Sequence, residues 1–512
     1  MSLLKSAATV SGLTLLSRIS GLVRDMLIAR YFGASAATDA FYVAFRLPNM
    51  LRRLFAEGAF QQAFVPMLSD IYENQSRERA QSFIDHVFTL LALAVFAASF
   101  IGVLVAPLLV WAIASGLRAD PAAFDLASAL TRWMFPYIAF MALVALAASI
   151  LNVHRRFAIP AVTPVLLNLS FIISTVFVAP RLSNPIWALA GAVLVGGILQ
   201  LATQWLALRR LGIHLRFCSI KTSLGDQGVK RVLGLMVPAL FGVGVAQLSI
   251  LINTNIASHL GHGAVTWLNY ADRLMEFPTA LLGVALGTVL LPSLSKAFAA
   301  SDMTRYNHLL DRGLQLVVLV AVPAALGLWL LSDALVAFLF QGKNYSPYDV
   351  HQTAIAVTGY SVGLIGLIGI KIVAPAFYAQ KNIKTPVIVA FLSLIVVQCV
   401  NLVAVPIMGH AGLAFSVGVG SVFNALTLLI ILLRKKIYRP EAGWLRHIVQ
   451  VIVGAVLMSV VLYFLSHDVA WTAMGWWARA SRVLGLVVLG ALLYFIGLSI
   501  MGWRISSLKQ FR

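Results

Sequence analysis

Charged side chains recur within an otherwise apolar stretch that runs from Ser17 to Pro66. They include Arg18, Arg24, Asp25, Asp39, Arg46, Arg52, Arg53 and Glu57. A charge at bilayer depth costs about 2.5–3.5 kcal/mol on insertion scales, so such residues usually face a polar cavity and mark a transport path. Arginine binds phosphate through two parallel hydrogen bonds and stays charged in a poorly solvated site. The stretch therefore predicts a cationic cavity suited to an anionic substrate.

Helical spacing predicts which of these side chains share a face. In the first helix, two pairs are seven residues apart, Ser17 with Arg24 and Arg18 with Asp25. In the second helix the same step relates Asp39, Arg46 and Arg53, although Pro48 is expected to bend the helix. A shorter group of charges recurs later in the chain, at Asp272, Arg273 and Glu276. These spacings predict that acids neutralise and orient some of the arginines.

Two interpretations of the charged residues remain open. In the first, a guanidinium cluster from the predicted helices at 7–30, 36–68 and 264–297 contacts substrate, chiefly through Arg18, Arg24, Arg52 and Arg273. In the second, internal ion pairs such as Arg53 with Glu57 only fix the packing of the helices. Asn49 and Thr266 adjoin the cluster, as hydrogen-bonding or packing residues. Lys371 interrupts an apolar run, where it either faces the cavity or extends to the membrane surface.

Composition indicates a membrane protein with many spans. The 512 residues are 60% hydrophobic and 11% charged, whereas a soluble domain carries about 25% charged residues. The net charge of +20 does not indicate nucleic-acid binding, because the basic residues are spread over short loops between apolar runs. Cys218 and Cys399 lie in different settings and suggest no disulfide or metal site.

A membrane-spanning helix needs about 20 mostly apolar residues. By this criterion the sequence predicts an all-α polytopic membrane protein with fourteen transmembrane helices. The predicted spans are 7–30, 36–68, 84–114, 130–152, 160–180, 185–208, 232–258, 264–297, 313–341, 350–379, 385–406, 411–433, 445–466 and 475–503. Most lysines and arginines outside the spans fall in alternate loops, so both termini are expected in the cytoplasm.

A short internal repeat predicts two related halves. Residues 44–47, Ala-Phe-Arg-Leu, match residues 271–274, Ala-Asp-Arg-Leu, at an offset of 227. Residues 65–69 resemble residues 291–295 at an offset of 226. Repeated halves with a site between them are common in secondary transporters. The predicted division is an N-lobe at 1–213 with helices 1–6, a C-lobe at 214–437 with helices 7–12, and helices 13 and 14 with the tail at 438–512.

Several motifs resemble the MurJ (MviN) family. They are Ser17-Arg18 through Arg24-Asp25, Thr38-Asp39-Ala40-Phe41, Leu47-Pro48-Asn49, the stretch from Leu51 to Phe60, the stretch from Tyr270 to Pro278, and Leu291-Pro292-Ser293-Leu294-Ser295. The resemblance covers essentially the whole chain. It implies a lipid II flippase of the bacterial cytoplasmic (inner) membrane, MATE-like in fold. It also implies two six-helix lobes around a cationic cavity, with helices 13 and 14 forming a groove for the polyprenyl tail.

The resemblance also implies cavity residues and partners. The matching cavity positions are Ser17, Arg18, Arg24, Asp25, Asp39, Asn49, Arg52, Arg53, Glu57, Arg273, Glu276 and Lys371. Some relatives have a sodium site that uses acids in helices 7 and 11, but 232–258 and 385–406 contain no Asp or Glu. The expected partners are lipid II, membrane lipids and the peptidoglycan-synthesis machinery.

No cofactor is expected, and the sequence has no GxxxxGK[ST] phosphate loop for ATP. Transport is therefore expected to use the membrane potential or an ion gradient. The rivals are a flippase for another polyprenyl-linked glycan, a MATE-type multidrug exporter and a membrane scaffold with purely structural charges. A multidrug exporter would favour an acidic cavity. An enzyme is not expected, because no nucleophile–base or metal constellation is found.

Overall fold

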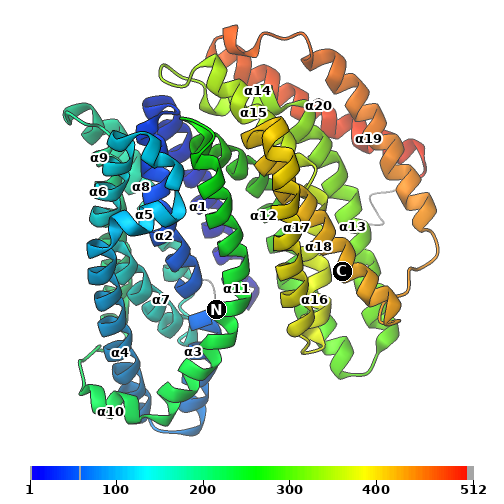
Figure 1. The fold of residues 1–512 in the computed structure, drawn as a ribbon. Coiled ribbons are helices and arrows are strands. Elements are labelled where there is room, and N and C mark those ends of the chain that lie inside the picture. The colour runs from blue at the N-terminus through cyan, green and yellow to red at the C-terminus, as the bar shows by residue number, and fades with distance from the viewer. Residues whose placement is uncertain (1–2, 57–58, 504–512) are drawn as a thin grey trace. The chain divides into compact units, whose positions relative to one another are not determined.

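The computed structural model describes residues 3–56 and 59–503, which form helices and connecting loops with no strand. The all-α prediction is therefore confirmed. The chain divides into two compact units, Met1–Thr266 and Trp267–Arg512. In Figure 1 the first unit runs from blue to green and the second from green to red.

The first unit is a bundle in which helices distant in sequence pack together. Its helices are α1 (Leu3–Phe32), α2 (Ala36–Ala56), α3 (Ala59–Asn74), α4 (Arg77–Leu104), α5 (Ala106–Ile113), α6 (Pro121–Met134), α7 (Tyr137–Val153), α8 (Ala158–Ile173), α9 (Trp187–Arg210), α10 (Ile220–Gly225) and α11 (Gln227–Ser258). Helix α1 packs on α8, and α8 packs on α9. Helix α12 (Ala264–Ala299) begins in this unit and continues into the second.

The second unit continues with helices that form a further bundle and a C-terminal pair. They are α13 (Met303–Leu330), α14 (Ser332–Phe340), α15 (Pro347–Ser361), α16 (Leu364–Ala379), α17 (Lys384–Met408), α18 (His410–Arg434), α19 (Trp444–Ser466) and α20 (Trp476–Ile500). The pair α19 and α20 lies side by side (Figure 1). A Cβ added to Gly497 would approach the Cα of Gly454 to 2.7 Å, so glycine permits this close contact.

The described residues include nine helices that are long and apolar enough to cross a membrane, or ten if α15 and α16 form one broken span. The predicted spans 7–30, 36–68, 232–258 and 264–297 correspond to α1, α2 with α3, α11 and α12. Helices α1 and α12 have 30 and 36 residues, which is enough to span a bilayer even though they carry charges. The chain is thus a polytopic membrane protein, and the count of fourteen spans is consistent with these helices.

The loop that precedes α11 is fixed to the first unit by Asp226. This carboxylate accepts two hydrogen bonds from the Arg79 guanidinium, at 2.6 and 3.0 Å, and lies 2.9 Å from Nδ1 of His86. It also caps α11 by accepting from the amides of Gly228 and Val229. Burial alone would raise the pKa of Asp226, but these hydrogen bonds outweigh burial and hold the pKa below its ordinary value.

A buried carboxylate also anchors the C-terminal helices of the second unit. Asp311 of α13 has no exposed surface. Its Oδ1 accepts from the Tyr438 hydroxyl at 2.6 Å, the Trp444 indole at 2.7 Å and the Glu441 amide at 3.2 Å. Two donors from the α18–α19 connection and one from the first residue of α19 thus converge on one oxygen, which fixes the start of α19 against α13.

The boundary between the compact units lies at Thr266 and Trp267, near the start of α12. The predicted lobes, with boundaries at 213/214 and 437/438, follow the internal repeat and the helix count instead. Contacts between elements do not test a division based on repeats, so the three-part division stays a prediction. Both members of the repeat are helical, since residues 44–47 lie in α2 and residues 271–274 lie in α12.

Candidate functional site

Arg24 is the centre of a hydrogen-bonded group in the first unit. Its Nε and Nη2 lie 2.9 and 2.7 Å from Oδ1 of Asp25, and its Nη1 donates to Oδ1 of Asn168 at 3.0 Å. The amide nitrogen of Asn168 donates to the Ser17 carbonyl at 3.0 Å and to the Ser20 hydroxyl at 2.9 Å. Asn168 belongs to α8 and the other four residues to α1. One amide side chain therefore joins two helices and fixes the Arg24 guanidinium.

Aromatic side chains lie beside this guanidinium. The Arg24 guanidinium carbon lies 5.4 Å from the centre of the Phe171 ring, a distance at which a cation is attracted to the ring face. Phe45 of α2 packs against both Phe171 and Tyr137, with ring centres 6.1 and 6.3 Å apart. Tyr137 is fully buried and lies within electrostatic range of Arg24 and Arg52. Helices α1, α2, α7 and α8 thus bring two arginines near one aromatic cluster.

Arg52 is oriented by a neighbour on its own helix. Its Nε donates to Oδ1 of Asn49 at 3.1 Å, three residues earlier in α2. The side chains of both residues are half-buried. The sequence placed Asn49 beside the charged cluster without choosing between packing and hydrogen bonding. The structure gives it a hydrogen bond that orients Arg52.

Asp39 is buried and caps the N-terminus of α12. Its two carboxylate oxygens accept from the Gly263 amide at 2.6 Å, the Thr266 amide at 2.9 Å and the Thr266 hydroxyl at 2.6 Å. Helix N-termini present unpaired amides and favour negative charge, which a cap from another helix satisfies here. Asp39 and Thr266 are 227 residues apart, so they occupy equivalent positions in the internal repeat. Both residues thus have a structural role in this conformation.

In the second unit, the charged residues of α12 form a local ion pair. Nη1 of Arg273 lies 3.0 Å from Oε2 of Glu276, and the two side chains are 29% and 35% exposed. The half-buried Asp272 also makes polar or electrostatic contacts. Lys371 of α16 is exposed. Arg273 therefore keeps surface available to a ligand while its orientation is restrained by Glu276.

The remaining predicted residues differ in setting. Arg18 is exposed on α1, whereas Asp25 is 4% exposed and pairs with the adjacent Arg24. Residues seven apart share a face but are separated by about 10 Å along the helix axis, which is too far for direct pairing. Arg53 is half-buried and has interactions. Glu57 lies outside the described residues, so its expected pairing with Arg53 stays a prediction.

Three residues of this group were not singled out from the sequence: Asn168, Phe171 and Tyr137. Asn168 is 6% exposed and is a polar residue within the apolar predicted span 160–180. That contrast was an available signal, because a polar side chain within a span usually has a hydrogen-bond partner. The aromatic residues gave no such signal, since Phe and Tyr are common in apolar helices.

Chemically, the arrangement of the first unit suits recognition of an anion without a bond-making step. Guanidinium groups provide planar donors for phosphate or carboxylate oxygens. Asn168 and Asn49 orient these donors, and the aromatic rings provide an apolar surface beside them. Within the described residues, no group of three or more His, Cys, Asp and Glu side chains could hold a metal ion.

The chain is similar to known proteins both in sequence and in structure. The family model described as lipid II flippase MurJ matches residues 28–479. A protein of Burkholderia cenocepacia described as lipid II flippase MurJ is 50% identical over 516 residues, covering 100% of this chain and 99% of the relative. A solved structure described as lipid II flippase MurJ in an inward closed conformation has a TM-score of 0.80 and 25% identity. That match covers 96% of this chain and 98% of the other.

A more distant likeness bears on the fold alone. An inward-facing multidrug resistance MATE family transporter has a TM-score of 0.69 at 13% identity, over 84% of this chain and 98% of that chain. The chain is thus a polytopic membrane protein with a MATE-like fold, in which charged residues lie inside long apolar helices. Within that class, the chain belongs to the MurJ family of lipid II flippases. The family predicted from the sequence motifs is confirmed.

Proposed function

We propose that this protein moves lipid II from the cytoplasmic to the periplasmic leaflet of the bacterial inner membrane by alternating access. Lipid II is a polyprenyl diphosphate that bears a disaccharide-pentapeptide, so its large head group is anionic. The observation that carries the proposal is the pair of arginines, Arg24 and Arg52, held near one aromatic cluster in a chain that matches MurJ over its whole length. The protein acts as a transporter and supports peptidoglycan synthesis.

The physical role of the arginines is to replace water around the diphosphate. Moving an anion through hydrocarbon is costly, and fixed guanidinium donors offset part of its lost hydration. The proposed substrate-contacting group includes Arg18, Arg24, Arg52 and Arg273. In the conformation described above, Arg24 and Arg273 are paired with acids. Binding of the diphosphate would then exchange a carboxylate partner for phosphate oxygens.

An inside-negative membrane potential suits this transport direction. Outward movement of one negative charge across the full field gains about 2.3 kcal/mol per 100 mV. Basic residues outnumber acidic ones within the predicted spans, so the same potential favours inward return of an empty, net-positive cavity. We propose that transport requires no ATP or cofactor, and that the potential or an ion gradient drives it. The bias of basic residues toward alternate loops supports cytoplasmic termini.

The decisive experiment depletes the protein in cells that carry it as their only MurJ-type flippase. A lipid II-cleaving enzyme added from the periplasmic side then reports the fraction of lipid II in the outer leaflet. Depletion should lower that fraction, and re-expression of the wild-type chain should restore it. An unchanged fraction, with accumulation of a different polyprenyl-linked glycan on the cytoplasmic side, would favour the rival glycan flippase. Such an outcome would reject lipid II as the substrate.

A further inference from the structure

A cavity of about 490 Å³ lies in the second unit, at the ends of several membrane-spanning helices. Leu330 and Ser466, the last residues of α13 and α19, both line it, as does Pro347, the first residue of α15. Candidate spans include α13, α19 and the broken pair of α15 with α16. Because helices end where the bilayer gives way to water, the cavity is placed at the level of the lipid headgroups.

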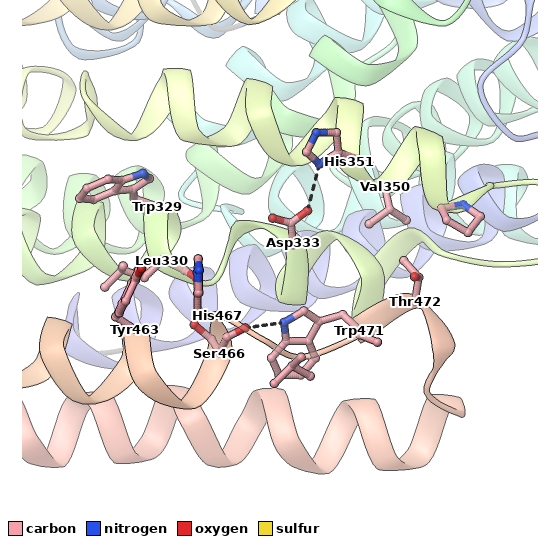
Figure 2. Close-up of a pocket in the computed structure, with 13 residues that line it drawn as sticks. Trp329, Leu330, Asp333, Val350, His351, Tyr463, Ser466, His467, Trp471 and Thr472 are labelled. Carbon is pink, nitrogen blue, oxygen red and sulfur yellow. Dashed lines mark hydrogen bonds and ion pairs between the residues drawn. The ribbon is translucent and has the colours of Figure 1, made fainter.

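The cavity combines one carboxylate with aromatic walls (Figure 2). Asp333 lies near the start of α14, with 55% of its side chain exposed, and its Oδ1 is 3.6 Å from Nδ1 of His351. On the opposite wall Tyr463 stacks on His467, with ring centres 4.6 Å apart. Trp471 is 5% exposed, and its indole donates to the Ser466 carbonyl at 3.3 Å. The carboxylate is thus accessible, and burial together with the hydrogen bond to Ser466 fixes the Trp471 ring.

Charge and shape in this cavity favour a cation. Asp333 is the carboxylate among the described residues that line the cavity, and no lysine or arginine is among them, so the cavity favours an ammonium group over an anion. Aromatic rings at Trp329 and Tyr463 add a cation–π attraction. A cavity of a few hundred cubic ångströms has the size of a small-molecule site. Arg482 lies with its guanidinium carbon 5.6 Å from the centre of the Trp471 ring, which brings a positive charge to the neighbouring surface.

An apolar stripe on α19 leads to the same cavity. Ile452, Val456 and Val460 are 52%, 55% and 49% exposed, and they follow one another at four-residue steps. The next position on this face is Tyr463, which lines the cavity and is 46% exposed. An acyl chain lying along this stripe would therefore bring the attached headgroup to the aromatic wall and Asp333.

We propose that this cavity binds the ammonium-bearing headgroup of a bilayer phospholipid, of the phosphatidylethanolamine type. Asp333 accepts hydrogen bonds from the ammonium, Trp329 and Tyr463 contact it through their rings, and Arg482 attracts the phosphate. The acyl chains lie on the α19 stripe. The site shares no residue with the arginine cluster of the first unit, and it does not depend on the identity of the transported lipid. With cytoplasmic termini, the site faces the periplasmic leaflet.

The test measures lipid retention on the purified full-length protein by native mass spectrometry. Phosphatidylethanolamine and phosphatidylglycerol with identical acyl chains are titrated in detergent. The wild type should bind phosphatidylethanolamine more tightly. Asp333→Asn should weaken that binding about tenfold, the effect of losing one charge-assisted hydrogen bond. Asp468→Asn is the matched control, because Asp468 is exposed in the same loop as His467 but does not line the cavity.

Two results would overturn the proposal. One is equal affinity of the wild type for the two lipids. The other is a preference for phosphatidylethanolamine that survives in Asp333→Asn. If Asp333→Asn does not yield folded protein, Trp329→Leu replaces it, since Trp329 is 53% exposed and leucine keeps an apolar side chain. Trp329→Leu should weaken phosphatidylethanolamine binding several-fold, and unchanged binding in that variant would also reject the site.

Discussion

Asn168→Ala removes the side chain that joins α8 to α1 and holds Arg24. Asn168 makes three hydrogen bonds to α1, to Arg24, Ser17 and Ser20, and it is 6% exposed. Alanine is compatible with a helix and adds no volume, so the substitution deletes these bonds without a steric clash. Arg24 keeps Asp25 as its partner but loses the contact that fixes the far end of its guanidinium.

The size of the effect follows from the number and type of bonds. Interhelical hydrogen bonds in membrane proteins contribute about 0.6 kcal/mol each on average. Loss of three should lower the free energy of unfolding by about 2 kcal/mol. Arg24 must then be ordered again when substrate binds. Ordering one flexible side chain costs about 0.5–1.5 kcal/mol, which predicts lipid II binding weakened roughly two- to tenfold.

Two measurements on purified protein separate stability from function. Unfolding in mixed micelles gives the free energy of unfolding, and lipid II titration in nanodiscs gives affinity. Ser170→Ala is the matched control on the same helix. The Ser170 side chain is also buried, and its hydroxyl donates to the Ala192 carbonyl at 2.8 Å, away from Arg24. This control should lose about 0.6 kcal/mol of stability and keep wild-type affinity.

Two outcomes would contradict a positioning role for Asn168. If Asn168→Ala is destabilised by the expected amount but binds lipid II as tightly as wild type, Asn168 only joins two helices. If its affinity and that of Ser170→Ala fall equally, the loss reflects general weakening of the bundle. In neither case would positioning of Arg24 explain substrate binding.

Three further predictions concern charge. Arg24→Ala or Arg273→Ala should insert normally into the membrane but fail to complement a depleted strain. Arg434→Ala, at the exposed end of α18, is the control and should complement. Growth on either of the first two variants at native expression would contradict the proposed site. Arg52→Lys should bind lipid II roughly ten- to a hundredfold more weakly than wild type, yet better than Arg52→Ala, because lysine keeps the charge but loses the planar pair of donors. If Arg52→Lys and the wild type bind lipid II equally well, Arg52 has only a general electrostatic role. The pKa of Asp226 is depressed, so its contribution to stability should be complete above the ordinary aspartate pKa of about 3.9 and lost as the pH falls below it. Thermal unfolding between pH 7 and pH 3 should therefore show a smaller acid-induced loss in Asp226→Asn than in wild type, and identical profiles would refute this assignment.

The sequence alone determined the class of protein and most of its helices. Hydropathy and loop charge are local properties, so apolar runs of about 20 residues could be located without a three-dimensional structure. The charges between Ser17 and Pro66 stood out because charged residues are costly in a membrane. The motifs around Arg24, Arg52 and Arg273 were long enough to indicate the MurJ family, which the comparisons confirmed.

Only the tertiary structure decided how the charged residues are paired. Asn168 reaches Arg24 across 144 residues, and Asp39 reaches Thr266 across 227. Helical periodicity defines the face on which a side chain lies, but it does not specify which face of a distant helix packs there. For that reason Asp39 could be predicted as a cavity residue from its spacing, whereas its capping of α12 required the packed helices. The same long-range packing created the aromatic cavity at Asp333, whose residues are scattered from α13 to the α19–α20 loop.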